Sequence, residues 1–245
     1  MYFAGGRAGF IGMMEMNDKV VTGSPYSAQA NTETVQTLSD GNQITRTHTV
    51  QIYRDSQGRT RREHTMSMLG PLAASGPPHE MISINDPVAG AQYMLNPQEK
   101  TVVKMPSPPQ GQQMGAKLKK RLKSELQGET EAQATSESLG TQVIEGVSAQ
   151  GTRVTETIPA GKIGNVKPIT IISERWYSPQ LQTYLLTKRS DPRFGDTVYK
   201  LTNISTAEPS PELFQVPADY TVKQGMGHAR GMMQFRTELP VPPPQ

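Results

Sequence analysis

The chain has 245 residues, of which 34% are hydrophobic and 6% are aromatic, and it contains 22 Gly, 20 Pro and no Cys. This composition favours one large domain with many turns and a modest core, and the lack of Cys excludes disulfides, thiolate metal sites and cysteine nucleophiles. The 25 basic and 22 acidic residues leave a formal charge of only +3, so no global field favours nucleic acid or an anionic membrane.

Residues 1–24 are rich in Gly and Met and show no hydrophobic period, so we expect a flexible N-terminal arm. The arm lacks the basic flank, the continuous apolar stretch and the cleavage site of a secretory signal. Either the chain is cytoplasmic, or its true start lies upstream of Met1. No run of 18 apolar residues occurs, so the sequence predicts no membrane-spanning helix.

A hairpin is predicted at residues 43–68, where QITRTHTVQIYR and RTRREHTMSM flank the turn DSQG. The alternation of side chains predicts two half-buried strands, and the final Gly of DSQG is typical of a type I turn that closes a hairpin. In the first strand one face carries Ile44, His48, Val50 and Ile52. In the second strand one face carries Arg62, His64, Met66 and Met68.

The arginines in YRDSQGRTRREH (53–64) allow two interpretations. Either they form a patch for nucleic acid or another anion, or they are water-facing charges of the hairpin that pair with Asp55 and Glu63. We favour the hairpin surface, because the turn distributes the arginines over both sides of a twisted ribbon.

Three short strands and one helix follow. EMISI, AQYML and TVVKM are separated by Pro- and Gly-containing turns, which is typical of a β-meander. Residues 106–137 are predicted to be an insertion, a linker plus the helix MGAKLKKRLKSELQ, in which leucines recur on one face. We favour a helix that docks by its leucines. The alternative is peripheral membrane contact through the basic residues 117–123.

A second β region contains the hairpin TQVIEGVSAQGTRVTETIPA and three strands, ITIISERWY, LQTYLLTKRS and TVYKLTNIS. The segment EPSPELFQVPADYTV then closes the domain, and residues 224–245 are predicted to be a disordered tail. The whole chain is therefore expected to contain nine or ten strands and one helix, with a single β domain at residues 25–223.

Motifs for chemistry are weak. GKIGN lacks the Ser or Thr of a phosphate-binding P-loop, no nucleophile elbow occurs, and Trp176 is the only Trp, whereas glycosidases usually stack sugars on several aromatic residues. His48 and His64 fall at inward-facing positions in mid-strand, which favours structural histidines. The four scattered His argue against a zinc site. We therefore predict no catalytic residue, no metal and no cofactor.

Several segments of the sequence, between about Ser24 and Val222, resemble a group of bacterial exported proteins of unknown function. They are IYRDSQGRTRRE, INDPVAGAQYMLNP, SLGTQVIEGVSAQGTRVTETIPAGKIGN, SERWYSPQLQTYLLTKRSDPRFGDTVYKLTNI and EPSPELFQVPADY. A final strand followed by E-P-x-P-x-x-F-x-V-P-x-x-Y is also similar, more distantly, to the lipoprotein-carrier (LolA-like) superfamily.

The resemblance implies a mainly β fold with minor α: one strongly curved antiparallel sheet, an unclosed half-barrel, with one amphipathic helix covering it. In that superfamily the concave face holds lipid acyl chains. The resemblance also implies export to the periplasm or cell envelope, with the signal peptide absent from this sequence. Because prolines cannot donate ladder hydrogen bonds, the closing segment should be a short helical turn and an extended piece, with Phe214 and Val216 plugging one mouth of the sheet and Tyr220 anchoring the end.

The leading hypothesis is a non-enzymatic envelope protein that binds an apolar ligand, lipid or lipidated partner in the curved sheet. The alternative is a structural or assembly module that engages itself or another envelope component through its termini. The candidate lining residues, which are otherwise plain core, are Ile44, Val50, Ile52, Tyr93, Leu95, Trp176, Tyr184 and Leu186.

Overall fold

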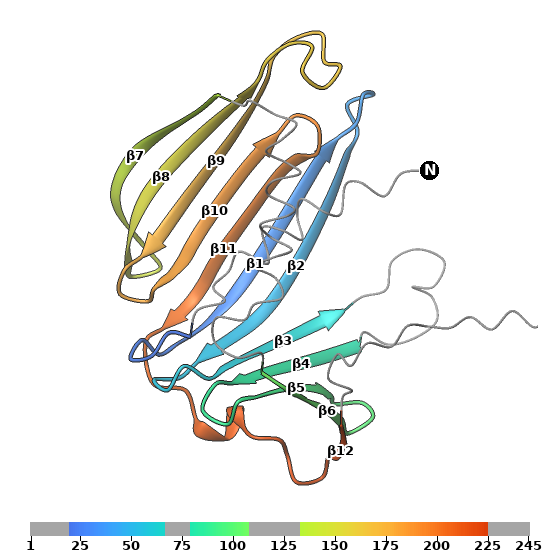
Figure 1. Cartoon of the computed structure of the whole chain (residues 1–245), viewed down its shortest axis with the longest axis vertical. Coiled ribbons are helices and arrows are strands. Elements are labelled where there is room, and N and C mark those ends of the chain that lie inside the picture. The colour runs from blue at the N-terminus through green and yellow to red at the C-terminus, as the bar shows by residue number, and fades with distance from the viewer. Residues whose placement is uncertain (1–19, 67–78, 108–132, 225–245) are drawn as a thin grey trace, which may run out of the picture.

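The computed structural model describes residues 20–66, 79–107 and 133–224 of the chain, and these form one 12-stranded sheet (Figure 1). The strands are β1 (Tyr26–Thr37), β2 (Gln43–Arg54), β3 (Thr60–Met66), β4 (His79–Asp86), β5 (Ala91–Asn96), β6 (Thr101–Pro106), β7 (Gln133–Ile144), β8 (Val147–Ile158), β9 (Ile169–Ser178), β10 (Thr183–Asp191), β11 (Gly195–Ser205) and β12 (Thr221–Gln224).

The sheet is open, with the order β12-β6-β5-β4-β3-β2-β1-β11-β10-β9-β8-β7. The prediction of one mainly β, unclosed sheet is therefore confirmed, although the strands number twelve rather than nine or ten. The predicted strands do not include β12. The predicted insertion at 106–137 includes residues 133–137, which form the start of β7. The helical content of the described residues is one 3₁₀ turn, η2 (Pro211–Phe214). Residues 1–19 of the predicted arm (1–24), the basic helix, and residues 225–245 of the predicted tail (224–245) lie outside the described residues. Within residues 20–24, Val21 is buried and the amide of Gly23 donates to the carbonyl oxygen of Ser56 at 2.8 Å.

Two regions of the sheet differ in strand length. The long region contains β1, β2 and β7–β11, whose strands have 9–12 residues. The short region contains β3–β6 and β12, whose strands have 4–8 residues, and Figure 1 shows these strands turning away from the long ones. The chain passes from one region to the other at the turn between β2 and β3.

The β2–β3 turn forms as its sequence predicts. The amide of Gly58 donates a hydrogen bond to the carbonyl oxygen of Asp55 at 3.1 Å, and Gly58 has a φ of 84°. A Cβ atom at this position would lie 2.7 Å from a methyl carbon of Val20. Gly58 is therefore required both for its backbone conformation and for the close approach of residues 20–23.

The inner face of the sheet is defined by Ala28, Ala30, Val50, Ile52 and Leu201. Ala28 pairs with Ile52, and Ala30 pairs with both Val50 and Leu201, so these five side chains point to one side. All five are buried, and they belong to the main cluster of the core. The other buried members of the main cluster are Tyr26, Ile144, Val147, Ala149, Trp176, Leu181 and Leu185.

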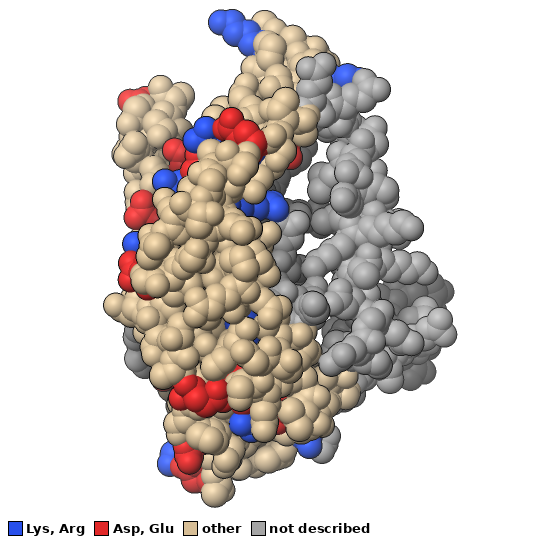
Figure 2. Space-filling model, turned by 90° about the vertical axis from the view of Figure 1, so that its left-hand side faces the viewer, with Lys and Arg blue, Asp and Glu red and all other residues tan. Residues whose placement is uncertain are grey.

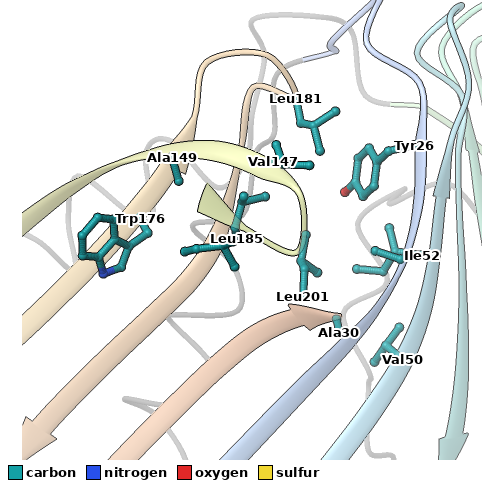
Figure 3. Packing of buried hydrophobic residues seen from close by; sticks show 12 residues of the cluster. Tyr26, Ala30, Val50, Ile52, Val147, Ala149, Trp176, Leu181, Leu185 and Leu201 are labelled. Atoms are coloured by element: carbon teal, nitrogen blue, oxygen red, sulfur yellow. The ribbon is translucent and has the colours of Figure 1, made fainter. Parts of the chain in front are cut away.

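Figure 3 shows the main cluster gathered between β1 and β2 on one side and β8–β10 on the other. Trp176 is the largest member, and its ring lies directly against Gly151 of β8. A Cβ atom on Gly151 would approach ring atoms of Trp176 to 2.6–2.8 Å. The absent side chain at Gly151 therefore makes room for the only Trp of the chain.

The small cluster lies on the opposite, outer face, in the short region. Its buried residues are Ile82, Ile84, Leu95 and Val102, and Tyr93, Val216 and Tyr220 pack against them. Ile82 pairs with Glu63, whereas the adjacent Arg62 pairs with Ile52 of the inner face, and neighbours along a strand point to opposite sides. The core of the chain thus changes face between the two regions.

The closing segment, residues 206–220, covers the small cluster (Figure 1). It contains η2, which begins at Pro211 and ends at the buried Phe214, and it continues into β12, which pairs in parallel with β6. The predicted helical turn, extended piece and packing of Val216 and Tyr220 are confirmed. The segment covers the outer face of β4–β6, however, and does not plug a mouth of the sheet.

Candidate functional site

The candidate site is a group of polar residues on the inner face: His48, Arg62, His64 and Tyr199. We call these four residues the basic cluster. They come from β2, β3 and β11, and four pairings place them on one face. Tyr199 and His48 both pair with Thr32, His64 pairs with Val50, and Arg62 pairs with Ile52. The basic cluster therefore borders the main cluster on the same face of the sheet.

The side chains of the basic cluster are half-buried. The imidazole rings of His48 and His64 stack, with centroids 5.8 Å apart and planes inclined by 22°. The hydroxyl oxygen of Tyr199 is buried and has no hydrogen-bond partner within the described residues. Arg62 likewise makes no hydrogen bond or ion pair among the residues that the structure describes. Buried polar groups normally have a hydrogen-bond partner, so the buried hydroxyl of Tyr199 and the half-buried guanidinium of Arg62 are unusual in lacking one among the described residues.

The electrostatics of the basic cluster disfavour additional positive charge. Burial lowers the pKa of His64, and the neighbouring His48 and Arg62 lower it further. Burial also raises the pKa of Tyr199, an effect that Tyr26 increases and that Arg62 opposes. Arg62 lies on the same sheet face as His64 and Tyr199.

Apolar side chains continue the inner face beyond the basic cluster. Met81 pairs with His64, and Met94 pairs with Ser83, which in turn pairs with Arg62. Val103 pairs with Met94 and so lies on the same face. Met94 is 39% exposed, and Met81 and Val103 are half-buried. An accessible apolar strip therefore adjoins a site of unpaired positive charge.

The eight predicted lining residues are not brought together. Val50, Ile52 and Trp176 are buried in the main cluster, and Leu186 packs against it. Tyr93 and Leu95 belong to the small cluster on the outer face, Ile44 is 38% exposed near the start of β2, and Tyr184 packs edge-to-face on Tyr177 at 5.3 Å. Only Val50 and Ile52 adjoin the basic cluster, and a lining role for the set stays a prediction.

Three of the arginines near the β2–β3 turn are internal, which corrects the expectation that they face water. Arg54 is 4% exposed and donates to the carbonyl oxygens of Ser24 and Leu181. Arg59 donates to the buried carboxylate of Asp55 and lies over the ring of Phe214.

Arg61 completes this set of internal arginines. Its Nε donates to Glu63 at 2.7 Å and its Nη1 donates to the carbonyl oxygen of Leu213 at 2.9 Å. The predicted hairpin is correct. Arg59 and Arg61 are internal because the closing segment contacts them, and Arg54 is internal because it lies against Ser24 and Leu181. They therefore form no anion-binding patch.

A second charged group lies at the β10–β11 hairpin. Asp191 is 2% exposed and accepts hydrogen bonds from the backbone and side-chain nitrogens of Arg193 at 2.7–3.1 Å. Burial of Asp191 opposes its ionisation, but the bonds from Arg193 hold the pKa of the carboxyl below its usual value. This group is fully paired and supports the turn.

Charges on the side of the sheet around β7–β9 are mixed. Figure 2 shows blue and red groups interleaved on that side. Arg153 illustrates the pattern, because it bridges Glu137 and Glu174 at 2.7 Å each. The basic cluster differs from these groups in having no acidic partner among the residues described.

The predicted strand faces group Arg62 with His64 in one strand and place His48 on a face of the other, with both histidines interpreted as structural. Tyr199, Met81 and Met94 were not predicted as site residues. The alternation of Arg62 and His64 with Glu63 was the available signal. The pairing of β1 with β11, which brings Tyr199 to the cluster, joins segments about 170 residues apart and leaves no local signal. Within the described ranges, no group of three metal-ligating residues occurs, and no helix is long and apolar enough to cross a membrane.

Comparison with known proteins gives structural similarity only. No family model matches the chain, and no curated protein matches it. Among solved structures, it is similar to the MucA/MucB complex of Pseudomonas aeruginosa, with a TM-score of 0.39, 14% identity and coverage of 82% of this chain and 58% of that chain. This chain therefore spans less than two thirds of the MucB structures that it matches first.

Two further structures are matched over at least 90% of their own length. A LolA superfamily protein from Nitrosomonas europaea matches with a TM-score of 0.31, 7% identity and coverage of 78% and 90% of this and that chain. Lipoprotein LppX of Mycobacterium tuberculosis matches with a TM-score of 0.31, 12% identity and coverage of 84% and 96%. A LolA superfamily protein and a lipoprotein are thus among the structures to which this chain is similar, and the similarity assigns the chain to no family. At these TM-scores it assigns this chain no activity.

Proposed function

We propose that this protein is a non-enzymatic binding protein of the cell envelope that holds an amphiphile, a lipid or a lipidated protein terminus, on its inner face. One observation carries the proposal: the short region buries its core on the outer face, which leaves Met81, Met94 and Val103 accessible on the inner face. Met81 pairs with His64, which in turn pairs with Val50 of the main cluster, so β3 separates the strip from the main cluster.

Two properties of this strip suit an acyl chain. Met side chains are flexible and polarisable, so they adapt to ligands of different shape. The basic cluster borders the strip along β3, whereas Lys223 of β12 pairs with Val103 at the other side of the strip. An amphiphile lies on such a surface with its apolar chain on the methionines and its polar end on the cluster.

The proposal is tested by native mass spectrometry of the full chain, together with calorimetric titration of decyl glucoside, a neutral amphiphile. We expect co-purifying lipid or a saturable site for decyl glucoside. Met94→Glu should abolish binding, because it places a charge on the apolar strip. Val88→Glu is the matched control, since Val88 is 68% exposed in the β4–β5 turn, away from the strip. Absence of bound lipid together with no titratable site would overturn the proposal.

The assembly module remains a second candidate, because one observation favours it. β7 is an edge strand of twelve residues, and its Val143 is 71% exposed. Long exposed edges can pair with another chain. Light scattering of the full chain separates the candidates: discrete oligomers that Val143→Lys dissociates, without bound lipid, support assembly.

A further inference from the structure

We propose that the basic cluster is an anion-binding subsite that takes the phosphate or carboxylate group of an amphiphile. The inference deepens the proposed function, on which it rests for the apolar part of the ligand. It assigns Arg62 as the main charged contact and Tyr199 as a hydrogen-bond donor, with His48 and His64 at the edge of the subsite.

The isolation of Arg62 is the first argument. Arg54, Arg59 and Arg61 lie within eight residues of Arg62, and each has partners: carbonyl oxygens for Arg54, Asp55 for Arg59, and Glu63 with a carbonyl oxygen for Arg61. Arg62 is half-buried and has no such partner within the described residues. A guanidinium withdrawn from water gains strongly from a planar or tetrahedral anion, to which it can donate two parallel hydrogen bonds.

The hydroxyl of Tyr199 is the second argument. It is buried without an acceptor among the residues described, and leaving a buried donor unpaired carries a free-energy cost. Burial raises the pKa of Tyr199, so the hydroxyl keeps its proton and remains a donor. Tyr199 and Arg62 lie on the same face of the sheet, since Tyr199 and His48 both pair with Thr32 and Arg62 pairs with Ile52. We infer that one anion on this face accepts from both groups.

The composition of the surrounding face is the third argument. The residues that pair across β11, β1, β2 and β3 at the cluster are Thr32, Ala30, Ala28, Val50, Ile52 and Leu201. None of these is acidic, so an incoming anion meets no repulsion from them. The stacked His48 and His64 supply further donors toward the same face. The accessible Met81 and Met94 then receive the apolar chain.

Calorimetric titration of the full chain with three probes tests the subsite. Decyl phosphate carries the anion and the chain, decyl glucoside carries the same chain with a neutral head, and inorganic phosphate carries the anion alone. We expect decyl phosphate to bind at least about tenfold more tightly than decyl glucoside, as one charge-assisted contact would provide.

Two variants and one control identify the residues. Arg62→Gln should reduce the affinity for decyl phosphate about tenfold and leave that for decyl glucoside unchanged. Lys188→Gln removes an equal charge from an exposed position whose partner Val198 pairs with Glu33, on the outer face, and should change neither affinity.

Tyr199→Phe separates a ligand contact from a structural role. A merely structural hydroxyl predicts a variant whose melting temperature rises or stays constant, with unchanged affinity. A donor to the ligand predicts the same thermal behaviour without probe, but an affinity for decyl phosphate reduced about threefold or more.

Binding of inorganic phosphate that depends on Arg62 supports the anion subsite and identifies a free anion as a sufficient ligand. Equal affinities for decyl phosphate and decyl glucoside, unaffected by Arg62→Gln, overturn the subsite and leave the proposed function intact. No binding of any probe overturns both.

Discussion

The long and short regions of this sheet bury their apolar side chains on opposite faces. In the long region, strands of 9–12 residues curve so that β8–β10 and β1–β2 enclose the main cluster on the inner face. In the short region, strands of 4–8 residues bury the small cluster on the outer face, beneath the closing segment. One continuous sheet therefore has a core on each side.

Because the two cores lie on opposite faces, a binding surface can arise on the sheet without a separate cavity. Where a strand buries its apolar residues on one face, its other face can carry charged and polar residues that a core would exclude. Arg62 and His64 occupy that free face beside the main cluster, and Met94 lies further along the same face. The change of face at the β2–β3 junction thus places charged and apolar side chains together.

The largest expected effect is the loss of the closing segment from the short region. Phe214→Ala should lower the free energy of unfolding by about 3–5 kcal/mol, because Phe214 is 3% exposed and its ring packs beneath the guanidinium of Arg59. Chemical denaturation monitored by circular dichroism measures the change. Val222→Ala is the control, since Val222 in β12 is 55% exposed. A silent Phe214→Ala would show that the small cluster does not depend on the closing segment.

A smaller effect is expected from the internal arginines that join the regions. Replacing Arg59 and Arg61 together by Gln should cost about 2–3 kcal/mol, because it leaves the buried Asp55 without its charged partner and removes the bond to Leu213. The same denaturation experiment measures it. Arg46→Gln on exposed β2 serves as the control. A loss within 0.5 kcal/mol, roughly what surface charges give, would mean that these arginines behave as surface residues.

The main cluster is tested by overfilling it. Gly151→Val should destabilise the long region by about 1–3 kcal/mol, because the new side chain would occupy the place of the Trp176 ring. The fluorescence of the single Trp reports the displacement directly. Thr152→Val, at the exposed neighbouring position, should leave both the fluorescence and the stability close to those of the parent protein.

The smallest effect concerns pH and the free inner face. The pKa of His64 is lowered in the folded protein, so the fold favours the neutral imidazole. The associated stabilisation is present above the ordinary His pKa of about 6.5 and is lost as the pH falls through that value toward the folded pKa. Thermal melts between pH 7.5 and 5.5 should therefore show a small loss of stability that His64→Gln reduces. An identical loss in His64→Gln would assign it to other groups.

Local pattern predicted most strands and turns of this fold. The alternation in QITRTHTVQIYR and the Gly of DSQG correctly give β2 and the β2–β3 turn, and the prolines of the closing segment exclude a long strand there. These features depend on residues within a few positions of one another, so the sequence displays them.

The features that could not be predicted are set by distant contacts. The polar start of β7 lacks an apolar period, and it is a strand because β8 pairs with it. The arginines of the hairpin are internal because Phe214 and Leu213 arrive from about 150 residues further on. The basic cluster needs β11 beside β1. Candidate lining residues chosen by hydrophobicity alone were therefore divided between two faces.

The β1–β11 ladder also has a consequence for folding. The chain contains two meanders, β1–β6 and β7–β11, in which each strand pairs with its neighbour in sequence. The β1–β11 ladder joins the two meanders, and β12, which follows β11, pairs with β6. During synthesis, the free edge of β1 must wait for residues 195–205 before it can pair. Such a long loop closure slows folding and leaves a strand edge open to wrong partners. The step that completes the sheet, and with it the site at Tyr199, is thus expected to be the slowest and the most prone to aggregation.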